Sequence, residues 1–547
     1  MRSPLRWLLA SVRHWLAGGG DPRRAWDTYR RWLSAHGLDA WFPEPEEQAA
    51  LDRAGFRPKG ASPAECRSIL RIVHLPEVAA PGSAGHRPGA GGSPGGPPIP
   101  PPATAPQPLG DPGTVLGELA AWLRQADSEQ LGVDAFLEHA AGSLARLAWP
   151  DGTGVIPFVL GMRLETALAL AVHQADDPTQ PCLLVGGDIS GIQRFIYTIS
   201  STGALKSLRA RSLYLEMLSR SLAADIASLA TRDLFGPGAE GLAEVYVGGG
   251  RFYCVLPNRQ DIHRALDELI RRRTGALLDE FDGDLRVGVA RTPFTPAGAW
   301  SDARSLWAQV QHGLSEAKNR PFHDRLGDPA FWQPGSTTTE CQVCRRPSAD
   351  LGPLTPEFDP GEEPPQACPA CRAFYEVGGR LSQLLGFAEV AANDPTRRPT
   401  TWRLAGTTLQ ALHGKGGPEA GVVRRWILPG HPLGPTDRRL PAARRVALGP
   451  DGDVLTIEEL AARSTGANWL GVVRMDVDRL GRLFGTGLPD GFRSVGHVAA
   501  LSRALEEFFS RRLADILGRD GEGRPRSITM IYGGGDDAFW IGPWDQV

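Results

Sequence analysis

The sequence predicts an α+β protein made of two ferredoxin-like units, the second of them incomplete, with a four-cysteine zinc module between them and a helical N-terminal region. Two observations carry this prediction: one series of strands and helices occurs twice, and two Cys-x2-Cys pairs lie between the copies. The chain has 547 residues, which is more than one hydrophobic core usually supports, so several domains are expected.

The N-terminal third of the chain is predicted to be mainly helical. Residues 1–78 are rich in helix formers, and five tryptophans are spaced like the buried face of a small helical unit. Residues 79–113 consist mostly of Pro, Gly, Ala and Ser, which cannot bury enough apolar surface to offset their ordering entropy, so a linker is expected. Residues 114–180 regain helical periodicity and are predicted to form a second helical segment.

Residues 181–325 contain the first copy of the repeated series. An apolar strand begins at Cys182 and ends at Asp188, and a helical region follows it. Two β runs then flank the turn Gly248-Gly249-Gly250, which is typical of a hairpin, and a helix and a last strand complete the series. The order β-α-β-β-α-β is that of a ferredoxin-like unit.

Residues 466–547 begin the same series again. A strand ends at Asp476, a helix follows, and a second hairpin turns at Gly533-Gly534-Gly535 before Asp536-Asp537. The strand-end aspartate and the glycine turn are 60 positions apart in the first copy (188 to 248) and 57 in the second (476 to 533), which indicates an internal duplication. The second copy stops after its hairpin, so we expect a unit truncated at Val547.

The carboxylates of the second copy predict a two-metal site. Phosphoryl transfer needs two divalent cations held by hard oxygen ligands, and adjacent strands would bring Asp476 and the pair Asp536-Asp537 to one sheet edge. Mg²⁺ or Mn²⁺ is the expected ion. The glycines of the turn leave room for phosphates near the backbone. The alternative, an ordinary surface turn rich in Gly and Asp, is disfavoured by the aspartate at the matching strand end.

The first copy carries no carboxylate pair after its glycine turn. Asp188 alone cannot hold two metals, so this half is expected to bind nucleotide without catalysing. Four basic residues could meet phosphate or RNA, although a solvated helix face is the more usual place for such side chains: Lys206, Arg209, Arg211 and Arg251.

Residues 326–395 are predicted to form a zinc module, and residues 396–465 a connecting segment. Cys341-x2-Cys344 and Cys368-x2-Cys371 are separated by 23 residues, and two such pairs complete a closed tetrahedral site of the structural kind. A redox pair is the alternative. The other three cysteines, Cys66, Cys182 and Cys254, lie in apolar contexts typical of core. The adjacent His323-Asp324 pair has no matching ligands upstream and is interpreted as chance.

Composition narrows the class of protein. The net charge is −3, so nucleic-acid contacts must come from local patches. No apolar run reaches the length of a membrane span and no signal peptide is recognisable, so no membrane partner and a cytoplasmic location are expected.

Five ordered motifs resemble the large subunit of type III-A CRISPR effector complexes. They are Gly187-Asp188-Ile189-Ser190-Gly191 with the following Gly203–Ser212, the turn Gly248–Phe252, the four-cysteine module, Arg474–Gly481, and Gly534-Gly535-Asp536-Asp537. The resemblance runs from about residue 155 to the C-terminus. It implies two polymerase or cyclase palm domains, activation by target RNA paired with guide RNA in a complex with other effector subunits, and synthesis of cyclic oligoadenylates from ATP for antiviral defence.

The resemblance also implies roles for residues. Asp536 and Asp537 would be the catalytic metal-site pair and Asp476 a further metal ligand, and the two palms would enclose two ATP molecules. The predicted nucleotide-binding set is Asp188, Ser190, Gly191, Gly248, Gly249, Gly250, Gly533, Gly534 and Gly535.

Two departures from the family leave alternatives open. Many members carry an N-terminal HD nuclease for single-stranded DNA, and residues 1–150 show no His-Asp ligand set, so that activity is not expected here. Members also continue beyond the second hairpin. A non-catalytic, ATP-binding scaffold of the effector complex is therefore the alternative to the synthase, and a nucleotide cyclase that acts alone is disfavoured by the duplicated palm.

Overall fold

The computed structural model describes the greater part of the chain. The described residues are 4–10, 12–13, 22–36, 38–54, 112–125, 131–144, 147–149, 155–199, 204–301, 303–333, 339–355, 363–391, 401–413, 421–441, 445–450, 454–480, 483–484, 487–535 and 537–547. Cys66, Asp536 and residues 79–111 of the predicted linker lie outside them.

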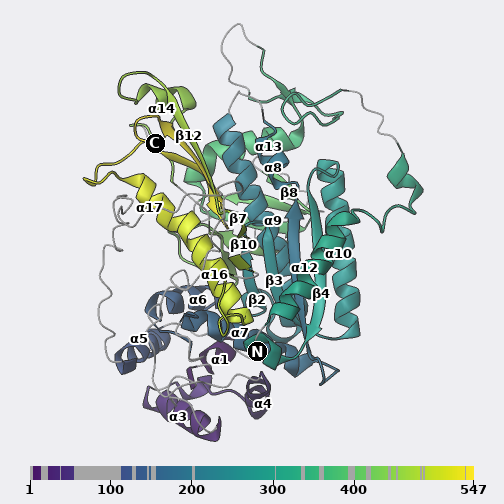
Figure 1. The fold of residues 1–547 in the computed structure, drawn as a ribbon, viewed down its shortest axis with the longest axis vertical. Coiled ribbons are helices and arrows are strands. Elements are labelled where there is room, and N and C mark those ends of the chain that lie inside the picture. Colours follow the sequence, from purple (N-terminus) through teal and green to yellow (C-terminus); the bar gives the residue numbers. More distant parts are fainter. Residues whose placement is uncertain are drawn as a thin grey trace, which may run out of the picture.

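Six of the described helices form one end of the molecule (Figure 1). They are α1 (Pro4–Ala10), α3 (Pro22–Ala35), α4 (Pro45–Arg53), α5 (Pro112–Gln125), α6 (Val133–Ser143) and α7 (Phe158–Gln174). Trp7 and Trp26 are buried in their core, and α7 packs against both α1 and α4. The predicted helical region is thus confirmed for the described residues, with the aromatic side chains at its centre.

The first palm is a complete ferredoxin-like unit. Its four strands, β1 (Cys182–Ser190), β2 (Glu244–Gly248), β3 (Arg251–Pro257) and β4 (Arg286–Phe294), pair in the order β2-β3-β1-β4. Its helices are α8 (Ile192–Tyr197), α9 (Ala204–Phe235) and α10 (Gln260–Phe281), followed by α11 (Pro296–Trp300) and α12 (Arg304–Asn319). Helix α9 packs on β2 and β3, and α12 packs on β4 and β1. Because β1 is central, nearly all its residues are buried.

The second palm repeats the core of this topology. Strands β12 (Leu470–Asp476), β13 (Thr529–Gly534) and β14 (Asp537–Pro543) pair in the order β12-β14-β13, which matches β1-β3-β2. Its helical segment is α16 (Val495–Glu507), a short π-helical stretch and α17 (Leu513–Gly518). In the first palm β4 pairs with the outer edge of β1. Among the described residues no strand pairs with the corresponding edge of β12.

The strand registers correct the alignment of the two turns by one residue. The sequence comparison matched Gly248 with Gly533. In the sheets Gly248 pairs with Arg251 and Gly534 pairs with Asp537, so Gly248 corresponds to Gly534. Arg251, opposite Asp188, therefore occupies the position that Asp537 occupies opposite Asp476.

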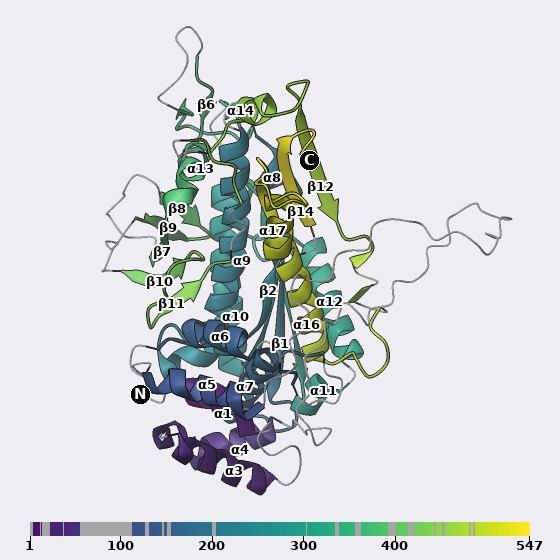
Figure 2. The ribbon, with the colours of Figure 1, turned by 90° about the vertical axis from the view of Figure 1, so that its left-hand side faces the viewer.

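A five-stranded sheet was not anticipated from the sequence. It contains β7 (Gly386–Ala391), β8 (Thr401–Leu404), β9 (Thr407–Leu412), β10 (Val422–Ile427) and β11 (Asp437–Arg439), and α14 (Ile457–Ala462) follows it. Figure 2 shows this sheet on one side of α9, with α16 and β14 on the other. Its strands are short and charged, so they lack the clean alternation by which strands are recognised.

A buried ionic network fastens this sheet to the first palm. Glu389 of β7 is fully buried and accepts hydrogen bonds from Arg424 at 2.9 Å and Arg273 at 3.2 Å. Burial alone would raise the pKa of Glu389, but the two guanidinium groups lower it to about 2. Since Arg273 lies on α10, the charged pairs bridge the sheet and the palm. Removing Glu389 would leave both guanidinium groups buried with one counter-charge fewer.

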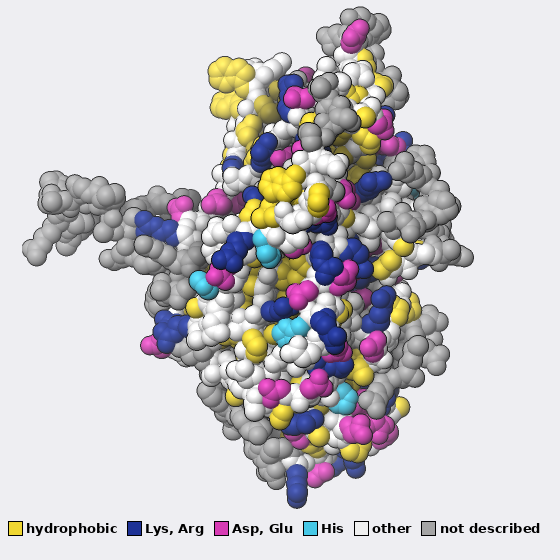
Figure 3. Space-filling model, turned by 90° about the vertical axis from the view of Figure 1, so that its right-hand side faces the viewer, with side chains coloured by type: hydrophobic (Ala, Val, Ile, Leu, Met, Phe, Trp, Pro, Cys, Tyr) yellow, Lys and Arg dark blue, Asp and Glu magenta, His cyan; other side chains and the backbone are white. Residues whose placement is uncertain are grey.

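The surface carries both signs of charge. The face in Figure 3 shows Lys and Arg side chains interspersed with Asp and Glu, without a large field of one sign. None of the described helices combines the length and the apolar character that a bilayer span requires.

Candidate active site and metal centre

The glycine turns of the two palms touch each other. A Cβ on Gly535 would lie 2.8 Å from the Cα of Gly249, and a Cβ on Gly249 would lie 3.1 Å from the Cα of Gly535. Both residues have positive φ, 59° for Gly249 and 64° for Gly535, which is the region that favours glycine. The close approach brings the acidic edge of the second palm against the turn of the first.

The acidic edge itself is formed by neighbouring strands. Asp476 ends β12 and pairs in register with Asp537, the first residue of β14. The hydroxyl of Tyr532 donates to Oδ2 of Asp537 at 3.0 Å, and the hydroxyls of Tyr532 and Tyr197 are 3.1 Å apart. Burial, and then these neighbours, raise the pKa of Tyr532, so it stays a donor. Asp536, the third predicted carboxylate, lies outside the described residues.

The matching position of the first palm has a different chemistry. Asp188 is 5% exposed and accepts a hydrogen bond from Nε of Arg251 at 3.0 Å. The Nζ atom of Lys318 lies 2.6 Å from the same carboxylate oxygen. Two protein cations therefore neutralise Asp188, where a carboxylate pair occupies the second palm. This arrangement agrees with the interpretation that the first palm holds no metal pair.

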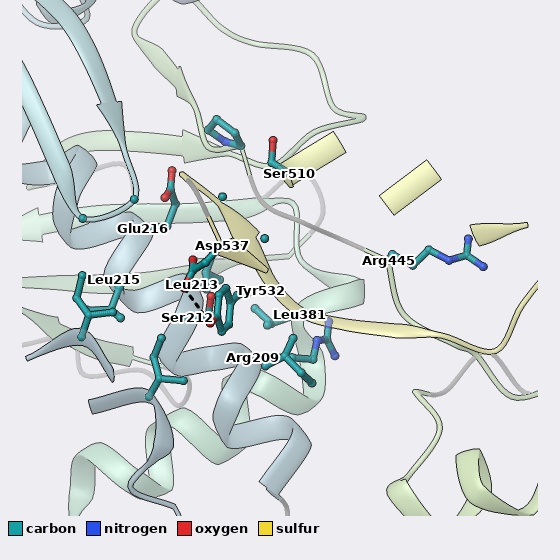
Figure 4. A pocket seen from close by; sticks show the side chains of 18 of the residues that line it. Arg209, Ser212, Leu213, Leu215, Glu216, Leu381, Arg445, Ser510, Tyr532 and Asp537 are labelled. Atoms are coloured by element: carbon teal, nitrogen blue, oxygen red, sulfur yellow. Dashed lines mark hydrogen bonds between the residues drawn. The ribbon is translucent and has the colours of Figure 1, made fainter. Parts of the chain in front are cut away.

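A pocket of about 590 Å³ lies between the two palms. Of the predicted site residues its lining includes Asp476, Asp537, Gly249, Gly250, Gly533 and Gly534. The structure does not place Asp188, Ser190, Gly191, Gly248 or Gly535 in this lining. Strands β12–β14 supply the acidic side of the pocket, and α8 and α9 supply the facing wall, so it is assembled from segments far apart in the sequence (Figure 4).

Several lining residues were missed in the sequence analysis. Tyr532 lies beside Asp537, and Tyr197 contacts Tyr532. Two glutamates, Glu216 of α9 and Glu506 of α16, come from equivalent helices of the two palms. Arg220 joins these glutamates, with contacts of 2.5 Å to Glu216 and 3.0 Å to Glu506. No local pattern marks such residues, because each is an ordinary member of an amphipathic helix or strand.

Burial controls the ionisation of Glu506. Burial raises the pKa of this carboxyl, Arg220 lowers it and Glu216 raises it again, which leaves the pKa at about 7. Glu506 therefore changes charge near neutral pH, at the boundary between the palms.

The interpretation of the basic residues as a solvated face was wrong for two of them. Arg211 is buried and donates to the carbonyl of Phe195 at 2.5 Å and to Sγ of Cys371 at 3.3 Å. Arg209 is also buried and lines the pocket. Lys206 is exposed and lies over the ring of Tyr375. The error arose because both faces of α9 are covered, one by the palm sheet and the other by α13 (Pro369–Arg380).

The four predicted zinc ligands come together. The sulfurs of Cys341, Cys344, Cys368 and Cys371 all lie within 4.8 Å of one another. Zn–S bonds of about 2.3 Å in a tetrahedron place sulfurs about 3.8 Å apart, and the Sγ atoms of Cys344 and Cys368 are 3.8 Å apart. The short strands β5 (Gly352–Pro353) and β6 (Gln366–Ala367) and helix α13 hold the cluster. In the described part of the chain it is the one such group of three or more His, Cys, Asp or Glu ligands.

Comparison with family models identifies the two palms. Residues 181–330 match domain B of the Csm1 subunit, and residues 469–547 match the second palm domain of Cas10/Cmr2. The chain is a homologue of the Cas10/Csm1 proteins of subtype III-A. One relative is the CRISPR system single-strand-specific deoxyribonuclease Cas10/Csm1 of Thermococcus onnurineus, 31% identical over 71% of this chain and 51% of its own length. The equally named protein of Mycobacterium tuberculosis is 30% identical over 67% of this chain and 46% of its own.

This Cas10/Csm1 homologue spans about half the length of the curated relatives it matches. Solved structures of the Csm1–Csm4 cassette share its fold. The apo cassette matches with a TM-score of 0.70 and 21% identity, over the whole of this chain and 75% of that one. The cassettes in complex with one ATP and with cA3 match with TM-scores of 0.71 and 0.70. The predicted fold class is thereby confirmed.

Proposed function

We propose that this chain synthesises cyclic oligoadenylates from ATP, with nucleotidyl transfer at the second palm and with target RNA as the activator. The observation that carries the proposal is the register pairing of Asp476 with Asp537 at the edge of a pocket between two palms. Carboxylates on adjacent strands are suited to holding Mg²⁺ or Mn²⁺. When bound, such ions supply charge neutralisation for the transferred phosphoryl group.

Residues of both palms would take part, some in holding ions and others in binding phosphates. Asp476, Asp537 and Asp536 would hold the ions, and Tyr532 would orient the Asp537 carboxylate through its hydrogen bond. The turns at Gly249 and Gly533–Gly535 would let phosphates approach the backbone. Solved cassettes of this fold are complexes with one ATP, cA3 and cA4, which supports an adenine nucleotide as the ligand.

The proposal extends to the partners of the chain and to its zinc cluster. The fold matches Csm1 in Csm1–Csm4 structures, so we expect other type III-A effector subunits as partners, with guide RNA and target RNA reached through the complex. The four-cysteine cluster would hold one structural zinc. We do not expect degradation of single-stranded DNA by this chain, because residues 1–150 lack the His-Asp ligand set. Cleavage that survives extensive purification would contradict this.

The test is product formation by the assembled complex. The chain, with its partner subunits, guide RNA and any further segment that wild-type activity requires, is incubated with target RNA, ATP and Mg²⁺ or Mn²⁺, and the products are identified by mass spectrometry. Asp536→Ala with Asp537→Ala should abolish synthesis while assembly with guide RNA persists. Asp545→Asn, an exposed carboxylate of the same palm, is the control. Synthesis at near wild-type rate by the double variant would overturn the assignment. Absence of product from the wild-type complex would favour an ATP-binding scaffold.

A further inference from the structure

Arg209 is a buried cation without an anionic partner. It lies in the second turn of α9, its side chain is among those that line the pocket, and the residue is 7% exposed. Among the described residues its guanidinium makes no hydrogen bond or ion pair, and burial alone lowers its pKa, to about 10. A guanidinium with so little exposure and no counter-charge is rare, because no interaction with the described protein offsets its desolvation.

Three other arginines around the pocket each have hydrogen-bond partners in the protein. Arg445 donates to the carbonyls of Gly518 at 2.8 Å and Arg526 at 2.9 Å. Arg220 pairs with two glutamates, and Arg211, two residues beyond Arg209, bonds to a carbonyl and a cysteine sulfur. Each of these has a structural reason to be buried. No contact within the described chain explains the burial of Arg209. We therefore look for the explanation in a ligand that enters the pocket.

The chemistry of that occupant follows from the donor. A guanidinium presents a planar fork of N–H donors that matches the oxygens of a phosphate, and the positive end of the α9 dipole also favours an anion near the first turns of the helix. No acidic residue occupies the first turn of α9 to satisfy that end. The acidic side of the pocket, by contrast, carries Asp476 and Asp537 and repels an anion unless cations intervene.

We propose that Arg209 of the first palm binds a phosphate of the nucleotide that occupies the pocket between the palms. The identity of the nucleotide rests on the proposed function, whereas the need for an anion at this place does not. Arg209 is then a substrate-binding residue contributed by the non-catalytic palm. The phosphate has two possible sources, the triphosphate of ATP and the phosphodiester of an oligoadenylate.

The first experiment compares binding by the wild-type complex and Arg209→Gln. Affinities for ATP with Mg²⁺, linear triadenylate and adenosine are measured by calorimetry. Loss of a charge-assisted contact should lower the affinity for the phosphate-bearing ligand by about tenfold to hundredfold. The affinity for adenosine should stay unchanged. Loss confined to ATP identifies the triphosphate, and loss confined to triadenylate identifies the phosphodiester. The proposal is overturned if the affinity for adenosine falls by the same factor, or if the affinity for neither phosphate ligand falls.

Two further variants separate binding from folding. Arg209→Lys should recover part of the affinity, because it keeps the charge and loses the fork. Without nucleotide, Arg209→Gln should melt at or above the wild-type temperature, because it removes an unpaired buried cation. Arg211→Gln should melt lower, because it breaks a structural contact, and the exposed Arg264→Gln should change neither measurement. A large drop in melting temperature for Arg209→Gln would mean a structural role and would contradict the proposal.

The outcomes also separate this inference from the proposed function. If the wild-type complex makes no cyclic oligoadenylate but binds ATP in an Arg209-dependent way, the synthase proposal fails and this inference holds. If Arg209→Gln makes product at the wild-type rate with unchanged KM for ATP and unchanged triadenylate affinity, the inference fails and the synthase proposal holds. A wild-type complex that binds neither phosphate ligand overturns the inference.

Discussion

The two palms share strand order and register but differ at one pair of positions. In the first palm Asp188 faces Arg251, and Lys318 completes the neutralisation. In the second palm Asp476 faces Asp537. The same backbone thus presents a closed ion pair in one copy and two carboxylates in the other. The two copies therefore share a backbone arrangement and differ in the charge of the residue opposite the strand-end aspartate.

The largest expected effect is an asymmetry between the two strand-end aspartates. Asp476→Asn should lower oligoadenylate synthesis by about 10³-fold or more, because metal stabilisation of charge is the main catalytic term. Asp188→Asn should lower it only by about tenfold or less, because Asp188 lies outside the pocket lining and acts indirectly, through its ion pairs with Arg251 and Lys318. Product formation and ATP affinity are measured for both variants in the reconstituted complex. Losses of equal size would mean that both palms are catalytic.

The zinc module should stabilise the first palm more than the second. Arg211 of α9 donates to Sγ of Cys371, which links the cluster directly to the first palm. Cys341→Ser should lose the expected one zinc per chain and melt about 5 °C or more below wild type, since metal binding energy is folding energy. Cys182→Ala, a buried cysteine of β1, should keep its zinc. Metal analysis and hydrogen exchange check this.

Hydrogen exchange sharpens that prediction. Loss of zinc should reduce protection in α9 more than in β14, because α13 packs on α9. Equal loss of protection in both elements would show that the module supports the two palms alike. Absence of zinc from protein purified without chelators would contradict the assignment of the metal.

Disturbing the contact between the glycine turns should lower the free energy of unfolding by a smaller amount. Gly249→Ala and Gly535→Ala each place a Cβ against backbone at positive φ, so each should lower the free energy of unfolding by about 1–2 kcal/mol. Because the two glycines touch, the double variant should deviate from additivity by about 0.5 kcal/mol or more. Gly534→Ala has open space for its Cβ and is the control. Additive losses in denaturant unfolding would mean that the turns do not contact in solution.

The smallest effect concerns pH. The pKa of Glu506 is raised from its usual value to about 7, so the folded state binds the proton more tightly than the unfolded chain. Its contribution to stability is therefore full at acid pH and is lost as pH rises through about 7. Glu506→Gln should reduce the fall in melting temperature between acid and neutral pH. The neighbouring, exposed Glu507→Gln should leave that fall unchanged. An unchanged slope in Glu506→Gln would show that this carboxyl titrates normally.

Local pattern was sufficient for much of the architecture. The two ferredoxin-like series follow from apolar runs separated by glycine turns, because strand alternation and turn chemistry are properties of short segments. The four cysteines could be assigned to one cluster because Cys-x2-Cys geometry is itself local. The carboxylates Asp476 and Asp537 could be paired because the strand order of a ferredoxin-like sheet brings their ends together.

The sequence by itself therefore determined the fold class, the duplication, the cysteine cluster and the acidic edge. Only the tertiary structure decided which residue faces which. The one-residue shift that matches Arg251 with Asp537 depends on strand register. The contact of Tyr197 with Tyr532 joins residues 335 positions apart. The burial of Arg209 depends on packing that α9 alone does not encode, since a helix sequence shows which residues share a face but not what covers it.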